Sequence, residues 1–222
     1  MLEIVLLTFK LALFTTLSLV VLATPLAWWL ARSRSWLKIP ISAIVTLPIV
    51  LPPTVLGFYI LILLAPDGWI GMWTHQLDFG PRAFTFSGLL FGSIIYSLPF
   101  AVQPLQNSFE AMGSRPLEVA STLGLSPWQR FSKVALPLAK PGYIAAAVLV
   151  FAHTLGEFGV ILMIGGNIPG RTKVISTAIY DYVEMLQYDK AHILAAGLLV
   201  FSFVIMVSLY TFQRWDGRPW AR

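Results

Sequence analysis

Apolar residues occur in five long runs that are separated by shorter polar segments. About 20 consecutive apolar residues are enough to cross a bilayer as a helix. A membrane β-barrel would instead alternate polar and apolar positions, and runs such as IVLLTF and AAAVLVFA do not alternate. The pattern therefore predicts an all-α integral membrane protein, a single domain over residues 1–222 with five transmembrane helices. The predicted spans are Val5–Ala31, Ile39–Ala65, Phe84–Val102, Tyr143–Ile164 and Ile193–Phe212.

The composition supports a membrane protein. Of the 222 residues 57% are hydrophobic and 11% are charged, whereas soluble domains have about 25% charged residues. The first run differs from a secretory signal, because it is longer than a signal's apolar stretch and its start contains Glu3 as well as Lys10. We expect it to be a retained anchor helix.

Lysine and arginine are unevenly distributed between alternate loops, and they accumulate on the cytoplasmic side of membrane proteins. An N-terminus outside places ten of the 15 cations inside with only three acids, and leaves five cations outside with six acids. The pattern thus predicts a multi-pass protein of the cell (inner or plasma) membrane, with the C-terminus in the cytoplasm. No clustered basic face indicates nucleic-acid binding. The inner cations are Arg32, Arg34, Lys38, Arg115, Arg130, Lys133, Lys140, Arg214, Arg218 and Arg222.

Residues 165–172, GGNIPGRT, differ by one residue from the phosphate-binding pattern G-x-x-x-x-G-K-[ST], with Arg171 in place of the lysine. In the predicted topology this segment follows the fourth span on the outer side, away from ATP. No strand precedes its glycines, as a phosphate loop requires. We interpret it as a helix stop at Gly165–Gly166 followed by a Pro-Gly turn.

No catalytic constellation is found in the sequence. There are no cysteines, and His75, His153 and His192 lie on separate segments without an H-x-x-x-H pair. No G-x-S-x-G elbow is present. We expect neither an enzyme, nor a cofactor, nor a metal site.

The inner loop 114–142 is predicted to contain two short helices. Ser114 is placed to cap the first, and Gly124 suits the left-handed position that closes it. Ser126-Pro127-Trp128-Gln129 has the residues of a capping box. Pro137 is predicted to end the second helix.

The two short helices are predicted to present different faces. Leu117, Ala120, Ser121 and Gly124 would form a small-residue face that another protein can approach closely. On the second helix, Trp128, Phe131 and Ala135 share one face and Arg130 and Lys133 point elsewhere, as in a helix lying on the lipid headgroups.

Glu118-Val119-Ala120, Gly124 and Leu136-Pro137 resemble the "EAA" loop of the membrane subunits of ABC importers, which reads E-A-A-x-x-x-G with a Leu-Pro end. The one departure is Val119 at the second position. The resemblance implies contact with a cytoplasmic ABC ATPase dimer through the coupling residues Glu118, Ala120, Ser121, Gly124, Leu136 and Pro137.

LPIVLPPTVLGFYIL (47–61) and HTLGEFGVILMIGGNIPGRT (153–172) are similar to stretches of molybdate permeases. Sulfate, thiosulfate and tungstate permeases of the same architecture remain alternatives for the anion. The resemblance implies a homodimer of this chain around a central pathway, and an extracytoplasmic molybdate-binding protein. Two other classes, a channel or secondary transporter without an ATPase and a membrane scaffold, give no role to the EAA-like loop.

Prolines 48, 52 and 53 interrupt the second span. Backbone groups freed at membrane depth need protein or a water-filled cavity around them. We interpret the span as a bent helix that lines the pathway near Pro52, Pro53, Thr54 and Gly57. The alternative is a packing kink against the first span, which contains Pro25.

Glu157 is an acid deep within the fourth apolar run. Its burial costs at least about 2.5 kcal/mol, so a partner is expected, and His153 lies one turn earlier on the same face. Because a carboxylate is a poor lining for a dianion, we assign Glu157 a structural or gating role. The predicted pathway or gate residues thus also include His153, Glu157, Asn167 and Arg171. The outer segment 166–192, with Asn167, Arg171, Lys173, Tyr180 and Tyr182, is either the surface that receives the binding protein or a helix that caps the pathway.

The predicted orientation can be tested with single cysteines, since the native chain has none. Cysteines introduced at Ser35 and Ser126 should be shielded from an impermeant thiol reagent in intact cells, and one at Asp78 should be labelled. Labelling of a cysteine at position 126 from outside would show that the predicted orientation is wrong.

Overall fold

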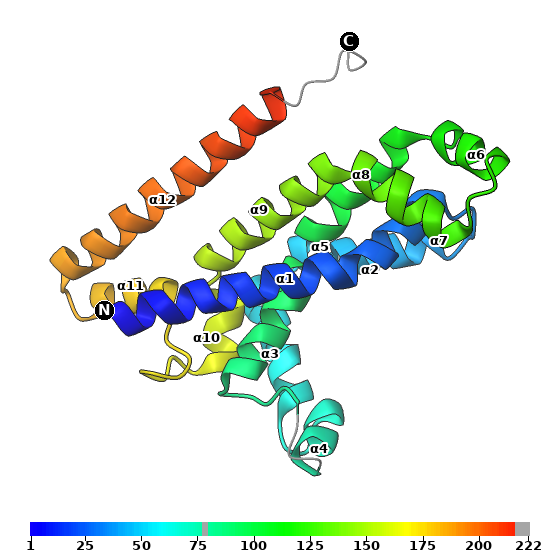
Figure 1. Cartoon of the computed structure of the whole chain (residues 1–222). Helices are drawn as coiled ribbons and strands as arrows, with labels where there is room; N and C mark the ends of the chain where they lie inside the picture. The colour runs from blue at the N-terminus through cyan, green and yellow to red at the C-terminus, as the bar shows by residue number, and fades with distance from the viewer. Residues whose placement is uncertain (77–79, 216–222) are drawn as a thin grey trace.

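The computed structural model describes residues 1–76 and 80–215, and these segments are entirely helical apart from turns and loops. The predicted outer residue Asp78 and the inner residues Asp216, Arg218 and Arg222 lie outside the described residues. The helices are α1 (Leu2–Arg32), α2 (Lys38–Val50), α3 (Pro53–Leu64), α4 (Trp69–Gln76), α5 (Phe86–Met112), α6 (Arg115–Thr122), α7 (Pro127–Arg130), a π-helical turn (Phe131–Ala135), α8 (Leu136–Leu138), α9 (Lys140–Gly156), α10 (Gly159–Gly165), α11 (Ile175–Glu184) and α12 (Tyr188–Trp215) (Figure 1).

Helices α1, α5 and α9 form the central bundle. Small residues allow close approach of these helices, as in other membrane bundles: Ala23 and Ala27 of α1 are fully buried, and a Cβ at Gly142 of α9 would lie 2.5 Å from Ser108 Cβ of α5. At the inner end, the Trp28 ring is 5.0 Å from Phe109 and 5.1 Å from Phe131, edge-on in both cases. The largest core cluster therefore joins the bundle to the π-helical turn of the inner loop.

Among the described residues, three helices, α1, α5 and α12, are long and apolar enough to cross a membrane. Up to five spans result if the bent pairs Lys38–Val50 with Pro53–Leu64 and Pro127–Leu138 with Lys140–Gly156 each count as one. The third span was predicted to end at Val102 but continues to Met112. Leu105 and Phe109 of this extension are buried, and Gln106 donates a hydrogen bond to Glu110 one turn later. The polar residues after Val102 thus lie on the exposed face of α5, while its buried face continues to Phe109.

The second span is broken, as predicted. The chain bends by 113° between α2 and α3, at Leu51 and Pro52, where the backbone is extended. α3 packs mainly on α10 and α5. Gly57, predicted to be a pathway residue, is buried, and a Cβ there would lie 2.9 Å from Met163 Cβ of α10.

The fourth span, predicted to be continuous over Tyr143–Ile164, is also broken. α9 ends at Gly156, Glu157 is extended, and α10 begins at Gly159. A Cβ at Gly159 would lie 2.8 Å from Pro53 Cβ. Close contact between the first residues of α3 and α10 therefore fixes both breaks at the same depth.

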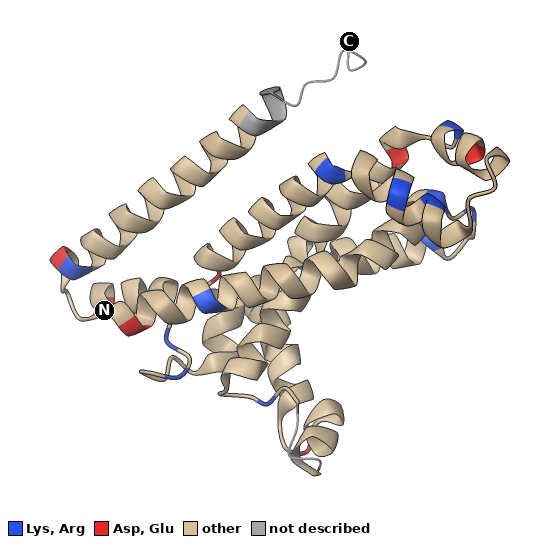
Figure 2. Ribbon diagram, in the orientation of Figure 1, with Lys and Arg blue, Asp and Glu red and all other residues tan. Residues whose placement is uncertain are grey.

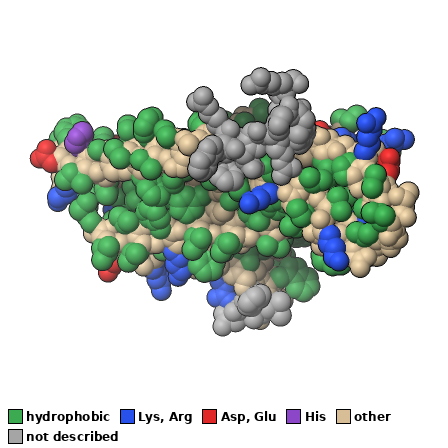
Figure 3. Space-filling model, turned by 45° about the horizontal axis from the view of Figure 1, so that its top comes forward, with side chains coloured by type: hydrophobic (Ala, Val, Ile, Leu, Met, Phe, Trp, Pro, Cys, Tyr) green, Lys and Arg blue, Asp and Glu red, His purple; other side chains and the backbone are tan. Residues whose placement is uncertain are grey.

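α12 packs on α11 and on α9, and its Phe201 ring contacts Phe9 of α1 and Phe151 of α9. The rest of the helix diverges from the bundle (Figure 1). In the most apolar stretch of 18 residues, only 11% of α12 is buried against the rest of the chain, compared with 50% of α5. Hydrophobic side chains cover much of the visible face of the molecule (Figure 3), whereas charged residues gather mainly toward the ends of the ribbon (Figure 2). This distribution is that of a chain whose middle zone faces lipid or other apolar protein.

Gly57→Ala should destabilise the protein by about 1–3 kcal/mol, since the new methyl group overpacks the α3–α10 contact. The thermal unfolding midpoint in detergent measures the change. Gly197→Ala is the matched control, because nothing lies within 4 Å of its Cβ position on α12, and alanine there should be neutral or stabilising. Equal midpoints for the two variants would contradict the close α3–α10 packing.

Candidate functional site

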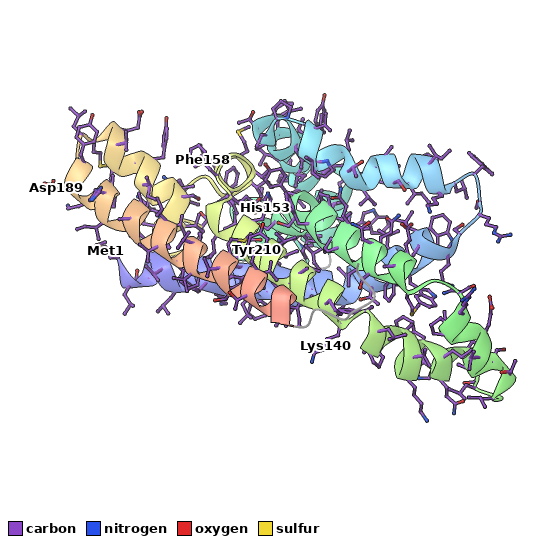
Figure 4. All side chains as sticks on the ribbon, turned by 90° about the horizontal axis from the view of Figure 1, so that it is seen from above. Met1, Lys140, His153, Phe158, Asp189 and Tyr210 are labelled. Atoms are coloured by element: carbon purple, nitrogen blue, oxygen red, sulfur yellow. The ribbon has the colours of Figure 1, made fainter. Side chains whose placement is uncertain are left out.

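The two helix breaks border one cavity of about 540 Å³. It brings together four of the predicted pathway residues, while Pro52 and Gly57 are outside its lining. The lining residues are Pro53, Thr54, Tyr96, Ala152, His153, Gly156, Glu157, Phe158 and Gly159. Figure 4 shows His153 near the middle of the molecule and Phe158 displaced from it toward the α11–α12 side.

His153 is held firmly in the cavity wall. Its Nδ1 is 2.9 Å from Ser97 Oγ, and its ring stacks on Phe100 with centroids 4.1 Å apart. The Tyr96 ring is 4.8 Å away on the other neighbouring turn of α5. These contacts fix the orientation of the imidazole, whatever tautomer it adopts.

The expected pairing of His153 with Glu157 is not formed. α9 ends at Gly156, so Glu157 is no longer one helical turn from His153 on a common face. The Glu157 residue is 3% exposed, and both carboxylate oxygens are buried without a hydrogen-bond partner in the described part of the chain. The Ser93 hydroxyl lies near this carboxyl group, outside hydrogen-bond geometry.

The backbone of the break is attached to the outer helix α11. The Ser176 hydroxyl donates to the Glu157 carbonyl at 2.5 Å, and the Tyr180 ring is 5.1 Å from the Phe158 ring. α11 thus lies beside the cavity. Of the two interpretations of segment 166–192, this position fits the helix that caps the pathway. Thr177, Ala178 and Ile175 of α11 are buried against the rest of the chain.

GGNIPGRT forms the turn that the sequence predicted at the end of α10. Gly166 adopts a left-handed conformation with φ of 63° and closes the helix. The Thr172 hydroxyl, fully buried, donates to the Gly165 carbonyl at 2.6 Å and accepts from the Ile168 N–H at 2.9 Å. Its two bonds are internal to the turn, and Arg171 is exposed. The turn is a structural helix stop.

Asn167 and Arg171, which were grouped with the pathway residues, lie outside the cavity lining. Asn167 Nδ2 donates to both carboxylate oxygens of Asp181, at 2.7 and 2.8 Å, and Lys173 pairs with the same carboxylate. This partly buried cluster ties the GGNIPGRT turn to α11. The Asp181 contacts were not predictable from the sequence, because they join segments that only the turn brings together.

In the inner loop, α6 closes as the sequence predicted. Gly124 has a φ of +80°, and the Leu125 and Gly124 N–H groups donate to the Ala120 and Ser121 carbonyls at 3.1 and 3.0 Å. This is the paired hydrogen-bond pattern of a left-handed helix stop. No atom lies within 4 Å of the Gly124 Cβ position, so the site is open to a partner. The predicted cap at Ser114 is wrong, since its side chain makes no capping hydrogen bond.

The second helix begins with the predicted capping box, in which Ser126 and Gln129 exchange hydrogen bonds of 2.9 and 3.3 Å. The helix was predicted to end at Pro137, but it continues to Leu138. A π-helical turn over Phe131–Ala135 precedes the proline. The wider turn offers room for a proline ring that would clash with the preceding turn of an ordinary α-helix.

The exposed face of the loop differs from the predicted one. Leu117 and Ala120 are each 5% exposed and pack inward, so they do not belong to an open face. The exposed residues include Glu118, Ser121, Gly124, Leu136 and Pro137. The sequence reasoning missed two large apolar residues among them, Val119 and Leu123, although their exposure opposite buried Leu117 and Ala120 follows from helical periodicity.

The second helix does not lie free on the membrane surface. Trp128 is exposed, but Phe131 packs on Trp28, and Ala135 is fully buried. A cavity of about 490 Å³ lies between this helix and α1, lined by Thr24, Pro25, Trp28, Pro127, Trp128 and Phe131. The helix is part of the folded domain, with Lys133 on its exposed side.

Broken apolar helices around a cavity, together with an ordered inner loop, define a membrane transport subunit. The chain belongs to the family of binding-protein-dependent transport system inner membrane components, whose model matches residues 23–217. It is accordingly a multi-pass membrane permease of the ABC type and not an enzyme, and the ATPase of such a system is a separate subunit.

Several curated relatives span most of the chain. It is 57% identical over 211 residues to the molybdenum transport system permease protein ModB of Azotobacter vinelandii, covering 95% of this chain and 93% of the relative. It is 33% identical to ModB of Haemophilus influenzae, covering 87% of this chain and 83% of the relative. It is 34% identical to the sulfate transport system permease protein CysT of Escherichia coli, covering 87% and 69%.

Solved structures share the fold. A bacterial ABC transporter for import of the polysaccharide alginate has a TM-score of 0.77 with 19% identity, covering 98% of this chain and 80% of that chain. The MetNI methionine ABC transporter in an inward-facing conformation has a TM-score of 0.66 with 18% identity, covering 97% and 94%. The expected fold, an ABC type I importer transmembrane domain, is confirmed.

Thr172→Val should lower the stability of the outer turn by about 1–3 kcal/mol, because two buried backbone groups lose their partner. Hydrogen exchange of the GGNIPGRT amides should rise, while ATP binding by the assembled complex stays unchanged. Arg171→Ala is the control, with neither effect expected from its exposed side chain. Loss of nucleotide binding in either variant would contradict the structural role of the turn.

Proposed function

We propose that two copies of this chain form the pathway by which an ATP-driven importer moves molybdate into the cell. The observation that carries the proposal is the 57% identity to a molybdenum transport permease over 95% of the chain. The energy comes from a cytoplasmic ABC ATPase dimer, and an extracytoplasmic binding protein delivers the anion. Sulfate is the second candidate, because the sulfate permease of Escherichia coli is 34% identical; thiosulfate and tungstate share its chemistry as oxyanions.

The homodimer is supported by the shape of one copy. The cavity at the helix breaks is bordered by only one side of α3, and the opposite side exposes large apolar residues. These are Val55, Phe58, Tyr59, Ile62 and Leu63. A second copy related by a two-fold axis covers such a face and encloses the pathway between the two cavities.

The orientation with the N-terminus outside and the C-terminus in the cytoplasm is supported by the distribution of cations. Lys38 at the start of α2 pairs with Glu110 near the end of α5 at 3.3 Å, so the α1–α2 connection and the inner loop share one end of the molecule. Figure 2 shows several lysines and arginines at that end. Cations on this side favour the cytoplasm. Membrane lipid covers the outer faces of α1 and α12.

The coupling surface is proposed to be the exposed part of α6 and the following turn. Glu118, Ser121 and Gly124 are exposed there, and Leu136 and Pro137 are exposed on the second helix. Ala120 contributes from behind, by packing α6 onto the chain's own core. The left-handed Gly124 lets a partner surface approach the backbone closely.

The transported anion can be determined in proteoliposomes that contain this chain, its ATPase and its binding protein. Molybdate-loaded binding protein should stimulate ATP hydrolysis and molybdate uptake more than sulfate- or tungstate-loaded protein. Stimulation by sulfate alone would make the chain a sulfate permease. Uptake without the ATPase would indicate a channel, and no uptake of any oxyanion would indicate a scaffold.

Gly124→Trp and Glu118→Lys should lose ATPase association or substrate-stimulated hydrolysis while the protein stays in the membrane in near-normal amount. A side chain in the left-handed region costs about 1 kcal/mol, too little to unfold the domain, so the effect should fall on docking. Lys133→Ala, away from this surface, is the control and should change much less. Full transport by both variants would show that the inner loop does not couple the subunits.

A further inference from the structure

The cavity at the helix breaks contains an acid that neither the family fold nor the transport activity accounts for. Both oxygens of the Glu157 carboxyl are buried and make no hydrogen bond to any residue that the structure describes, and Glu157 is 3% exposed. No lysine or arginine of the described residues lines the cavity. An ionised carboxylate in such a place loses its hydration without gaining a counter-ion, which costs several kilocalories per mole.

The groups around Glu157 also fail to supply a positive charge. Ser93 on α5 is fully buried, and its hydroxyl is unpartnered and near the carboxyl group. The titratable neighbours are Tyr96 on α5 and His153 on α9. The His153 ring is hydrogen-bonded to Ser97 and stacked on Phe100. On α11 the neighbour is Tyr180, which packs on Phe158. α10 has no titratable side chain, and the only one on α3 is the exposed Tyr59.

The cavity must nevertheless accept an anion if the proposed function holds, and this inference rests on that function. A fixed negative charge in its wall repels a dianion strongly, because Coulomb energies are large where water is excluded. A carboxylic acid in its neutral form removes this repulsion and can donate a hydrogen bond to the Ser93 hydroxyl.

We propose that Glu157 is held protonated and uncharged in the wall of this cavity, with Ser93 as its hydrogen-bonding neighbour, and that it thereby determines the charge of the oxyanion pathway. The proton is retained because no charged group within residues 1–76 and 80–215 compensates the carboxylate. The carboxyl loses its proton as the pH rises, the wall becomes negative, and oxyanion transport slows. Glu157 is a positioning and charge-setting residue and does not itself bind the ion.

Infrared difference spectra of the assembled complex test the protonation state without transport. At a mildly alkaline pH, where exposed carboxyls are ionised, the wild type should show a protonated-acid carbonyl band that Glu157→Gln lacks and Ser93→Ala shifts. If Glu157→Gln fails to assemble, the Ser93→Ala comparison decides alone. A wild type without such a band, or a band that Ser93→Ala leaves unmoved, overturns the proposal.

Molybdate uptake by proteoliposomes tests the consequence. The ratio of Glu157→Gln to wild-type uptake should rise with pH, by on the order of tenfold once the wild-type acid ionises. Glu3→Gln, a change at an exposed acid at the start of α1, should follow the wild-type profile. A ratio that is constant over the whole pH range, with the glutamine variant slower throughout, overturns the proposal. A wild type that moves no molybdate refutes the proposed function instead, and the infrared result still decides the state of Glu157.

Discussion

The contact between Pro53 and Gly159 is the constraint on which the rest of the structure depends. Only a glycine fits at position 159, since a Cβ there would lie 2.8 Å from Pro53 Cβ. Each residue stands at the start of a helix that follows a break, so the contact joins two half-helices at one depth of the domain. The interrupted backbone is then satisfied locally: the Val55 and Leu56 N–H groups donate to the Pro52 carbonyl, and Ser176 donates to the Glu157 carbonyl. Irregular backbone at membrane depth survives only with such partners.

The domain consists of a helix bundle and of the pair of half-helices that the Pro53–Gly159 contact holds together. α1, α5 and α9 pack through small residues into a bundle, while α3 and α10 pack on each other beside it. The cavity lies where the two parts meet, and the first residues of α3 border it. The start of a helix carries partial positive charge, which favours an anion without the strong binding of a fixed cation. A pathway needs that moderation, because an ion that is bound too tightly does not leave.

Periodicity and composition predicted the class, the helical fold, the bend at Pro52 and Pro53, and the stop at Gly166, because each depends on local chemistry. The break after Gly156 was missed, since AHTLGEFGVILMIG is apolar enough to read as one helix and only the contact with Pro53 interrupts it. The close packing of Gly57 on Met163 was not predictable for a related reason, because a glycine that lines a pathway and a glycine packed under a side chain are identical in sequence. The inward direction of Ala120 was open to prediction from its spacing to Leu117, whereas the partnerless state of Glu157 depended on tertiary packing.

The inner loop is connected to the pathway through aromatic packing. Phe131 of the π-helical turn contacts Trp28 of α1, and Trp28 contacts Phe109 near the end of α5. α5 in turn carries Tyr96, which lines the cavity, Ser97, which is hydrogen-bonded to His153, and Ser93, which lies near the Glu157 carboxyl group. A displacement of the loop by a docked partner therefore acts on α1 and α5 together, because their shared core leaves little free space to absorb it. The half-helices α3 and α10 are attached to α5 by fewer contacts than α1 is. The relative movement that opens or closes the cavity should consequently occur between this pair and the bundle, with the Glu157 break and the Leu51–Pro52 break as its two hinges.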